Sequence, residues 1–598
     1  MLYRSTVFYL LIFIIILSNF AGANYKPRIA IDKDGSVYIN EEVAVRFRVN
    51  NGNLTPEDRA KLTAQRLIAQ SEAGVKAEAF TAKADGARAL VYAGDQVICI
   101  ANPEDAKAAN STPLALAQSW TSNIKRLFAL PPLKLSTNSL TVPEKENRRL
   151  KVGGTSTGEI QAKIENELVA SIQIDQQTRV ITVTGITIGE TVLDVCVNEF
   201  VEKCLIEVKR YAGRVSVTSP AQVTGNPAPI SLLEFVARQK FMESVILEYG
   251  TKVSILSVNA GKTALETGAR REAKVAYRIT GEGYLPVNAE IAIPIENINL
   301  PREEAEQIFY SNDPESLRKF ELLYAARLQL HTPTKVLYHH QNFMGQRIHF
   351  IVEIVNTSDI PATFRISDGI SAPNIDTYHV GYVAVDRFFN SELSNISYMQ
   401  NVPPYSRLIL VSDMLKNHDT SSGIFQIKQI SSNPALVRIT AAQPNIDNVS
   451  VGQILPAPQS LVVPYNQHVY EKPVKKITET YTVGGRWTFI SVGRHPLVSA
   501  DNSKTLHGNY GVKYDITVKV ENPTNRARKV EVAFEPSAGM ASGIFYVDGK
   551  KSVVKYATPP KEITLNSYNI QPGETRNIRI VTIPLAGSNY PITVIVKS

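Results

Sequence analysis

The sequence has few of the residues that bind metals. Its 598 residues include three cysteines and nine histidines, and no CxxC or HxxxH pair occurs among them. Because structural zinc sites draw their ligands from such pairs, we expect no zinc site and no cofactor. Glycine and proline number 33 each, and 44% of the residues are apolar. That globular composition excludes a collagen-like, a wholly disordered and a multi-span membrane protein.

Long apolar runs are also scarce, and the one that stands out is N-terminal. It extends from Val7 to Leu17, follows Arg4 and precedes a small-residue site ending at Ala23. A run of this length is too short to cross about 30 Å of hydrocarbon and is typical of a secretory signal. We therefore predict a signal peptide over residues 1–23, a secreted, periplasmic or cell-surface location, and no membrane span after cleavage. The alternatives are a buried helix, or an N-terminal anchor if the site is not cut.

Charge of one sign is not concentrated anywhere along the chain. The 64 Lys and Arg residues against 56 Asp and Glu residues give a net charge of +8. The densest basic stretch, NRARK at 525–529, is typical of a solvated turn. Binding to nucleic acid needs a cluster of cations that releases counterions from the phosphates. We therefore predict no nucleic-acid partner.

Two of the three cysteines flank a short polar turn between apolar strands. Cys196 and Cys204 would lie opposite one another if those strands form a hairpin. Because an exported chain folds in an oxidising compartment, we predict a disulfide between them. A change of one residue in register would point the two thiols apart, which leaves two unrelated buried cysteines as the alternative. Cys99 is predicted to be a buried apolar residue.

Short strands separated by turn residues follow Pro131 at intervals of about eight to twelve residues, which predicts an all-β sandwich over 131–212. The segments LTVPEKENRRLKVGGT, VASIQID and VITVTGITIGETVLDV resemble the opening strands, the central strand and the closing hairpin of bacterial immunoglobulin-like (BIG2-like) domains of cell-surface proteins. The resemblance implies a spacer or adhesive module without catalysis.

An internal repeat occupies the C-terminal half. Residues 347–367 can be laid over residues 513–533 without a gap. Apolar residues alternate in both copies, so each strand is expected to have one buried and one wet face. Asn356 and Asn522 then open the turn in each copy. The pattern resembles the tandem immunoglobulin-like sandwich modules of bacterial exported proteins, which implies adhesion or spacer units.

The fold class predicted from these patterns is multidomain and mainly β, with immunoglobulin-like β-sandwiches interleaved with two small α+β domains. Capping signals at Thr55 and Ser231 begin helices in the two α+β segments, and we expect a further helix from Asp313. The predicted division is a signal peptide (1–23), an α+β domain (25–130), a bacterial immunoglobulin-like sandwich (131–212), an α+β domain (213–334), a sandwich (335–445), a linker (446–479) and a sandwich (480–598).

Histidines are the first candidates for chemistry. His339 and His340 are adjacent in YHHQN, and adjacent residues of a strand point to opposite faces, so they cannot both bind one metal without a bulge. We expect them at a polar strand end or a domain seam, with a metal-binding or catalytic role as the alternative. His349 falls between two apolar residues of the repeat and is predicted on the wet face.

Aromatic residues give a second candidate. Tyr481 and Trp487 in TYTVGGRWTFISVG would stack on a sugar if they are exposed, and would fill the last sandwich if they are buried. No strand-to-helix nucleophile elbow occurs, since the only suggestive serine, in DGISAPN, lacks the second glycine. No catalytic residue is therefore predicted.

The function expected from the sequence is that of an exported structural or interaction protein, an adhesion or envelope scaffold protein without catalytic activity of its own. Its partner would be a protein or an envelope polymer, bound through loops or sheet edges. Two alternatives are kept. One is an envelope hydrolase or its accessory subunit, with a deep cleft that holds two carboxylates or a metal bound by His339 and His379. The other is a carbohydrate-binding protein that uses Tyr481 or Trp487.

Overall fold

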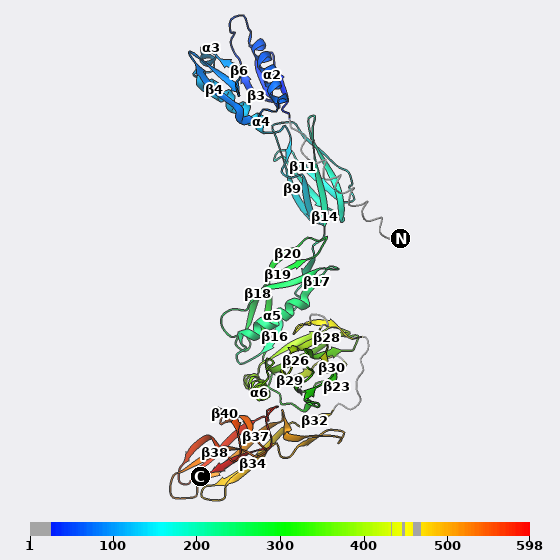
Figure 1. Ribbon diagram of the computed structural model, residues 1–598, viewed down its shortest axis with the longest axis vertical. Helices are drawn as coiled ribbons and strands as arrows, with labels where there is room; N and C mark the ends of the chain where they lie inside the picture. The colour runs from blue at the N-terminus through cyan, green and yellow to red at the C-terminus, as the bar shows by residue number, and fades with distance from the viewer. Residues whose placement is uncertain (1–25, 432, 445–448, 459–467) are drawn as a thin grey trace, which may run out of the picture. The chain divides into compact units, whose positions relative to one another are not determined.

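The computed structural model describes residues 26–431, 433–444, 449–458 and 468–598. The predicted signal peptide (1–23) lies outside these residues. The chain divides into two compact units, Met1–Ala212 with Thr280–Pro286 and Gly213–Ile279 with Val287–Ser598. Both are built mostly of β-sheets, which confirms the predicted fold class (Figure 1). Within the described ranges, no helix has both the length and the apolar character needed to cross a bilayer.

The first unit begins with an α+β fold. Its strands and helices are β1 (Ile29–Ile31), β2 (Ser36–Ile39), β3 (Glu42–Arg46), α2 (Pro56–Glu72), β4 (Phe80–Asp85), β5 (Arg88–Ala93), β6 (Gln96–Ala101), α3 (Pro103–Ala108) and α4 (Pro113–Ala129). Thr55 caps α2 by accepting a hydrogen bond from the Asp58 backbone at 3.2 Å, as predicted. Trp120 of α4 packs edge-on against Phe47, with the ring centroids 5.3 Å apart. The helices thus bury their apolar stripes against the short sheets.

A β-sandwich completes the first unit. One sheet has the order β10-β13-β14-β8 and the other β11-β12-β9-β7. Their bounds are β7 (Lys134–Leu135), β8 (Ser139–Pro143), β9 (Asn147–Gly153), β10 (Ile160–Ile164), β11 (Ala170–Asp175), β12 (Val180–Gly185), β13 (Gly189–Val197) and β14 (Phe200–Lys209). Alternate residues of the strands are buried, as in β13, so the two sheets share one apolar core.

The predicted disulfide does not form in this sandwich. The β13–β14 hairpin pairs Leu193 with Cys204 and Cys196 with Val201. Cys204 therefore points into the core, whereas Cys196 lies on the outer face, and both thiols are free. The prediction was wrong because the turn is tight enough to set a register that places the two cysteines on opposite faces. Cys99 is buried as expected.

A long mixed sheet forms the centre of the second unit. Its order is β18-β19-β20-β16-β27-β26-β29-β24-β21-β32, and β22 also pairs with β24. The bounds are β16 (Ala221–Thr224), β18 (Lys252–Asn259), β19 (Arg270–Thr280), β20 (Val287–Asn297), β21 (Gln307–Ser311), β22 (Ser316–Leu317), β24 (Thr334–Asn342), β26 (Ala362–Ile370), β27 (Ser397–Val402), β29 (Thr420–Gln429) and β32 (Val469–Glu471). Through β16 and β27, the segments 213–334 and 335–445 contribute to one sheet.

The helix expected from Asp313 is wrong. Ser316 and Leu317 form β22, which pairs in parallel with β24, and β23 (Glu321–Arg327) follows. The acidic cap pattern is only a weak local preference, and the pairing partners on β24 and β30 (Leu436–Ala442) override it. Leu317 is buried in this strand pairing.

A second sheet faces the long one and closes the central sandwich. Its order is β23-β30-β25-β28-β31, with β25 (Ile348–Asn356), β28 (Ser406–Leu415) and β31 (Ile454–Pro456). Phe350 of β25 contacts Tyr338 of β24 between the sheets, with ring centroids 5.4 Å apart. β31 and β32 lie in the range predicted as a linker (446–479), and β33 (Val474–Thr482) begins in it. Each of the three pairs with a strand of a sheet.

The outer face of β25 is buried too, contrary to the prediction for His349. Every residue of β25 is buried. His349 forms a 2.8 Å hydrogen bond through Nε2 with Ser412 Oγ. Next to it, Glu353 pairs with Arg407 at 3.0 Å and with Arg438 at 3.1 Å. The sequence correctly predicted which side chains of β25 alternate between its two faces. The outer face, however, is covered by other residues instead of being exposed to solvent.

The C-terminal sandwich has the sheets β33-β37-β42-β39-β40 and β34-β43-β38-β41. Its further strands are β34 (Thr488–Val492), β37 (Lys513–Glu521), β38 (Arg528–Pro536), β39 (Ala541–Val547), β40 (Lys550–Ala557), β41 (Ile563–Ile570), β42 (Thr575–Thr582) and β43 (Ile592–Lys597). Tyr514, Ile516, Val518 and Val520 all point into its core, as the alternation predicted.

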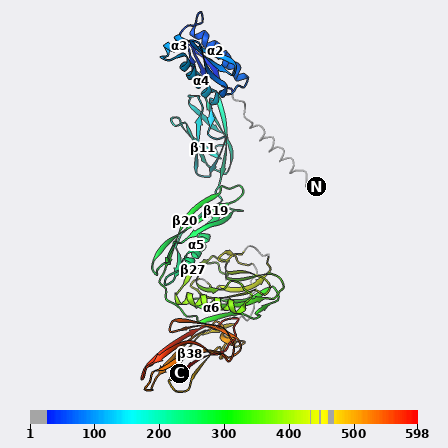
Figure 2. The ribbon, with the colours of Figure 1, turned by 60° about the vertical axis from the view of Figure 1, so that its left-hand side comes forward.

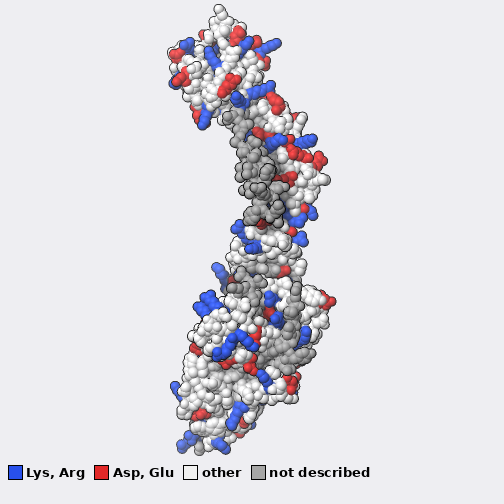
Figure 3. Space-filling view, turned by 45° about the vertical axis from the view of Figure 1, so that its right-hand side comes forward, with Lys and Arg blue, Asp and Glu red and all other residues white. Residues whose placement is uncertain are grey.

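On the face of the molecule seen in Figure 3, basic and acidic side chains are interspersed.

Candidate functional site

The candidate site is formed around helix α6 (Thr377–Leu393), which connects β26 to β27 and crosses the long sheet. In Figures 1 and 2 the helix lies on the side of the central sandwich that faces the C-terminal sandwich. The packing is close because Gly369 of β26 has no side chain: a Cβ there would lie 2.3 Å from the backbone oxygen of Ala384. Gly381 permits a similar approach of Ala586 to the other side of α6.

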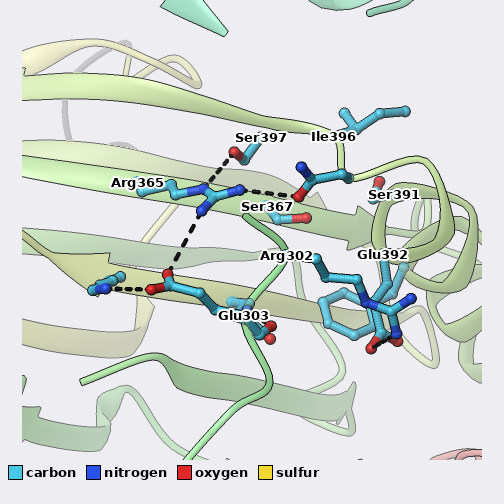
Figure 4. A pocket seen from close by; sticks show the side chains of 12 residues that line it. Arg302, Glu303, Arg365, Ser367, Ser391, Glu392, Ile396 and Ser397 are labelled. Atoms are coloured by element: carbon cyan, nitrogen blue, oxygen red, sulfur yellow. Dashed lines mark hydrogen bonds and ion pairs between the residues drawn. The ribbon is translucent and has the colours of Figure 1, made fainter. Parts of the chain in front are cut away.

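A small charged cavity lies at the C-terminal end of α6, shown in Figure 4. Its volume is about 30 Å³, enough for a single water molecule. Arg365 points across it and donates to Ser397 Oγ at 2.9 Å and to Asn395 Oδ1 at 3.0 Å. Glu303 lies 3.6 Å from Arg365 and also pairs with Lys428. The hydrogen-bonding groups of Arg365 are thus engaged by the protein.

Beside this cavity is a group of charged residues that we call the Glu392 cluster: Glu392, Arg302, Glu304, Lys335 and Lys513. The side chains of Glu392, Lys335 and Lys513 are largely buried, and those of Arg302 and Glu304 are partly exposed. Glu392 of α6 pairs with Arg302 at 2.6 Å and with Lys513 of β37 at 2.7 Å. Burial alone would raise the pKa of Glu392, but the charges of Lys335, Lys513 and Arg302 outweigh it and the pKa is lowered. The carboxylate is therefore ionised at neutral pH.

Lys335 is the most enclosed cation of the Glu392 cluster. Burial lowers its pKa to about 8, although Glu392 opposes that shift. Its Nζ donates to the Gly511 carbonyl at 3.1 Å and lies 5.3 Å from the centre of the Phe388 ring. A lysine with a pKa near neutrality is a group that enzymes use, but here its ammonium is directed at a carbonyl and a ring rather than at a cavity.

A larger and mostly apolar cavity, which we call the Asp368 cavity, adjoins the first one. Its volume is about 390 Å³, and it lies between the start of α5 (Ile230–Ser244), strands β26 and β27, and α6. Burial raises the pKa of Asp368 to about 6, and the nearby Arg387 opposes this rise. Asp368 shares the inward face of β26 with Phe364 and Ile366. An acidic residue in phase with apolar residues was a signal in the sequence that we missed.

The two predicted histidines are fully buried on opposite sides of β24. His340 hydrogen-bonds to Ser311 Oγ and to the Pro314 carbonyl, each at 2.8 Å, and burial lowers its pKa to about 4. For His339, burial and the proximity of His340 lower the pKa to about 3. Neither ring nitrogen of His339 has a hydrogen-bond partner among the described residues, and its nearest carboxylate is Glu315 at 3.7 Å. His339 lies at the seam between the central and C-terminal sandwiches, whereas His340 faces Phe350 inside the central sandwich.

Nothing in the described ranges brings three His, Cys, Asp or Glu side chains together as a metal site would. His379, the proposed partner of His339 in a metal site, lies in the first turn of α6, where its backbone amide donates to Asp376. His339 and His340 point to opposite faces, as the sequence predicted.

The aromatic candidates separate into one buried and one exposed residue. Tyr481 is inaccessible, and its hydroxyl lies 2.6 Å from Ser598 Oγ. Trp487 is 41% exposed just before edge strand β34, 6.3 Å from the ring of Phe489, which is 55% exposed. Lys597 Nζ lies 4.7 Å from the centre of the Trp487 ring. Only Trp487 of the predicted pair is available to a ligand.

Comparison with known proteins adds one family match. Residues 36–129 match a family described as a domain of unknown function (DUF8459). This match covers the N-terminal α+β fold alone, so it assigns no family to the rest of the chain and no activity. No curated protein matches the chain.

Solved structures give only distant likenesses. Domains 4 and 5 of the S-layer protein SbsC are 17% identical, with a TM-score of 0.13 over 13% of this chain and 45% of that one. The chain thus spans less than half of that neighbour. The D00-D0 domain of intimin is 10% identical, with a TM-score of 0.12 over 27% of this chain and 98% of that one. TM-scores this low carry no argument about fold or function.

Proposed function

We propose that this protein is an exported structural or interaction protein, an adhesion or envelope scaffold protein without catalytic activity of its own. The observation that supports this most is how the strands use their apolar residues. In the 131–212 sandwich and in the C-terminal sandwich, alternate side chains fill a core between two sheets, as Tyr514 to Val520 do in β37. Recognition is then left to loops and to the outer strands of the sheets.

Several outer strands are available for recognition. In the C-terminal sandwich, β41 and β34 each pair on one side only among the described strands. Such strands carry backbone N–H and C=O groups on the free side that can accept a strand of another chain. A protein partner bound in this way, or an envelope polymer held by loops, fits this architecture. Secretion through the predicted signal peptide and the BIG2-like character of residues 131–212 belong to the same proposal.

The proposal is tested on the full-length protein in its producing cells. Sequencing of the mature N-terminus should find Asn24 as the first residue, and fractionation should place the protein in the envelope or the medium. The purified mature protein should then co-sediment saturably with an insoluble envelope fraction and release no soluble saccharide or peptide. Heat-unfolded protein is the control. A cytoplasmic location, or steady release of soluble fragments, would contradict the proposal.

The exposed Trp487 favours a second candidate, in which the C-terminal sandwich binds a carbohydrate. Trp487 and Phe489 lie close together at an edge strand with Lys597 against one of the rings. Flat exposed rings can stack on the apolar faces of sugar rings, and the neighbouring cation can hydrogen-bond to hydroxyl groups.

We expect Trp487→Ala to weaken binding to chitin or to peptidoglycan sacculi by at least about tenfold, as measured by depletion from solution, because it removes the largest stacking surface. The matched control is Tyr249→Ala, which removes a 95% exposed aromatic ring elsewhere in the same unit. Equal binding by both variants and the unmodified protein would remove this candidate.

A further inference from the structure

The Asp368 cavity has the size and lining of a small-molecule site. Its volume of about 390 Å³ falls in the range of about 300–1,000 Å³ that such sites occupy. Most of its wall is apolar, and the main contributors are Leu232, Phe235, Tyr398, Leu410 and Phe425. These residues come from α5, β27, β28 and β29, so secondary-structure elements rather than loops form most of the wall.

A carboxylate without a partner opens into this apolar wall. No hydrogen bond or ion pair joins the Asp368 carboxylate to any residue that the structure describes. Arg387, the nearest cation, instead donates through Nη1 to the Ile370 carbonyl. Ser391 Oγ donates to the backbone carbonyl of Asp368, not to its side chain. The Asp368 carboxylate is thus partly buried and has no ion-pair partner among the described residues.

A partly buried carboxylate without an ion-pair partner is unfavourable, and a ligand that supplies a positive charge reduces that penalty. A neutral apolar ligand would leave the carboxylate unpaired, and an anion would be repelled by it. The wall holds one further charged side chain, Arg387, whose Nη1 donates to the Ile370 carbonyl. Its remaining polar residues, such as Ser231, Ser367 and Asn390, are neutral. The cavity is therefore best matched by a ligand that has one cationic group attached to an apolar body.

We propose that the Asp368 cavity binds a small amphiphilic cation, a primary amine or guanidine with an apolar body, whose charged group pairs with the Asp368 carboxylate. The apolar body lies against Phe235, Tyr398 and Phe425. This activity goes beyond the structural role proposed above and does not depend on it.

Binding should depend on pH through Asp368. The titratable groups near its carboxylate are Arg387 on α6, Tyr398 on β27 and Tyr338 on β24. Burial keeps the pKa of each tyrosine well above its usual value of about 10. Because the pKa of Asp368 is about 6, amine affinity should be full above pH 7 and fall as the carboxyl becomes protonated towards pH 5.

The test is calorimetric titration of the purified full-length protein with hexylamine and phenethylamine at pH 7.5, with hexanol as the uncharged match for hexylamine. We expect the amines to bind and hexanol to bind at least about tenfold more weakly. Asp368→Asn should lose amine binding by a similar factor while keeping the fold, because it removes a buried charge. Asp359→Asn, the same change at an exposed turn, should bind as the unmodified protein does.

A second variant, Leu232→Trp, fills the cavity from α5 and leaves Asp368 in place; it should abolish amine binding, with circular dichroism confirming that the fold is retained. The proposal is overturned if no amine binds, if hexanol binds as well as hexylamine, or if Asp368→Asn binds the amines unchanged. Binding of a lysine-containing peptide without binding of free amines would also overturn it in favour of a protein partner.

Discussion

Single asparagines close the ends of strands in the second unit. Asn522 donates to the carbonyls of Arg526, Ile570 and Gln571 at 2.9–3.1 Å. Its Oδ1 accepts from the backbone of the residue two positions on. Asn356 has the same pattern of partners in the repeat copy. One amide side chain thus joins the turn that follows it to a neighbouring strand, which explains why both copies of the repeat carry asparagine there.

Asn342, at the end of β24, has this arrangement as well, with bonds to the carbonyls of Gln346, Leu415 and Lys416. The sequence comparison could not find this third position because Asn342 follows YHHQ rather than an alternating apolar strand. Hydrogen-bond geometry, not hydrophobic pattern, makes the three sites equivalent.

Replacing Asn522 by alanine should destabilise the C-terminal sandwich by about 2–4 kcal/mol, because three carbonyl groups lose their donor in a buried position. The free energy of unfolding in urea, followed by the fluorescence of Trp487, measures this. Asn569→Ala, at an exposed position of β41, is the matched control and should change stability by less than about 0.5 kcal/mol. A loss below about 1 kcal/mol for Asn522→Ala would contradict the role assigned to the side chain.

At the scale of the element, β24 is covered on both faces. Tyr338 and His340 pack against Phe350 of the facing sheet. Lys335 and His339 point the other way, towards α6 and the loops of the C-terminal sandwich: a Cβ on Gly587 would lie 3.1 Å from His339 Cε1. A strand buried on both faces shows no polar alternation, and β24 accordingly gave no clear strand-face signal in the sequence.

The buried histidines make the stability of the protein pH-dependent. Their folded-state pKa values, about 3 for His339 and about 4 for His340, lie below the value of about 6.5 for an unfolded histidine. Their contribution is therefore full above pH 6.5 and is lost as the pH falls from 6.5 towards 4, because only the unfolded chain takes up the protons.

His339→Leu should accordingly reduce the loss of unfolding free energy between pH 7 and pH 4.5 by about 2 kcal/mol, in urea titrations at the two values. His331→Asn replaces an exposed histidine and should leave the pH dependence unchanged. Identical pH profiles for His339→Leu and the unmodified protein would show that His339 is not kept neutral by burial.

Comparison of these elements shows how far the sequence could predict the fold. The alternation of apolar residues identified the buried faces of β25 and β37, because a strand with one core face repeats its apolar residues at every second position. The asparagines that open the turns were found at the ends of these two strands. The alternation misjudged His349, since the cover over the outer face of β25 comes from segments distant in the chain. It did not lead to the Asp368 cavity, because the approach of α5 and α6 forms that cavity, although the acidic residue in phase with Phe364 and Ile366 was visible in the sequence.

At the scale of the whole molecule, the second unit is held together by charge as well as by apolar packing. The Glu392 cluster joins α6 to Arg302 in the loop after β20 and to Lys513 on β37 of the C-terminal sandwich. Lys335 of β24 adds a fourth part of the chain. A carboxylate at the C-terminal end of a helix is unfavourable by itself, since the helix dipole is negative there, so the surrounding cations are needed for its stability.

Glu392→Gln should therefore weaken the attachment of the C-terminal sandwich to α6. The change leaves Lys335, Lys513 and Arg302 close together with less negative charge to balance them, and removal of one partner from a buried ion pair costs about 3–5 kcal/mol. We expect thermal unfolding to gain an additional transition at lower temperature and limited proteolysis to release a C-terminal fragment that is protected in the unmodified protein. Glu521→Gln removes an exposed ion-pair partner of Lys519 on β37 and is the control. This variant should unfold and be cleaved as the unmodified protein is. An unchanged profile for Glu392→Gln would mean that the apolar contacts of α6, such as Phe389 on Tyr546, suffice to hold the sandwich in place.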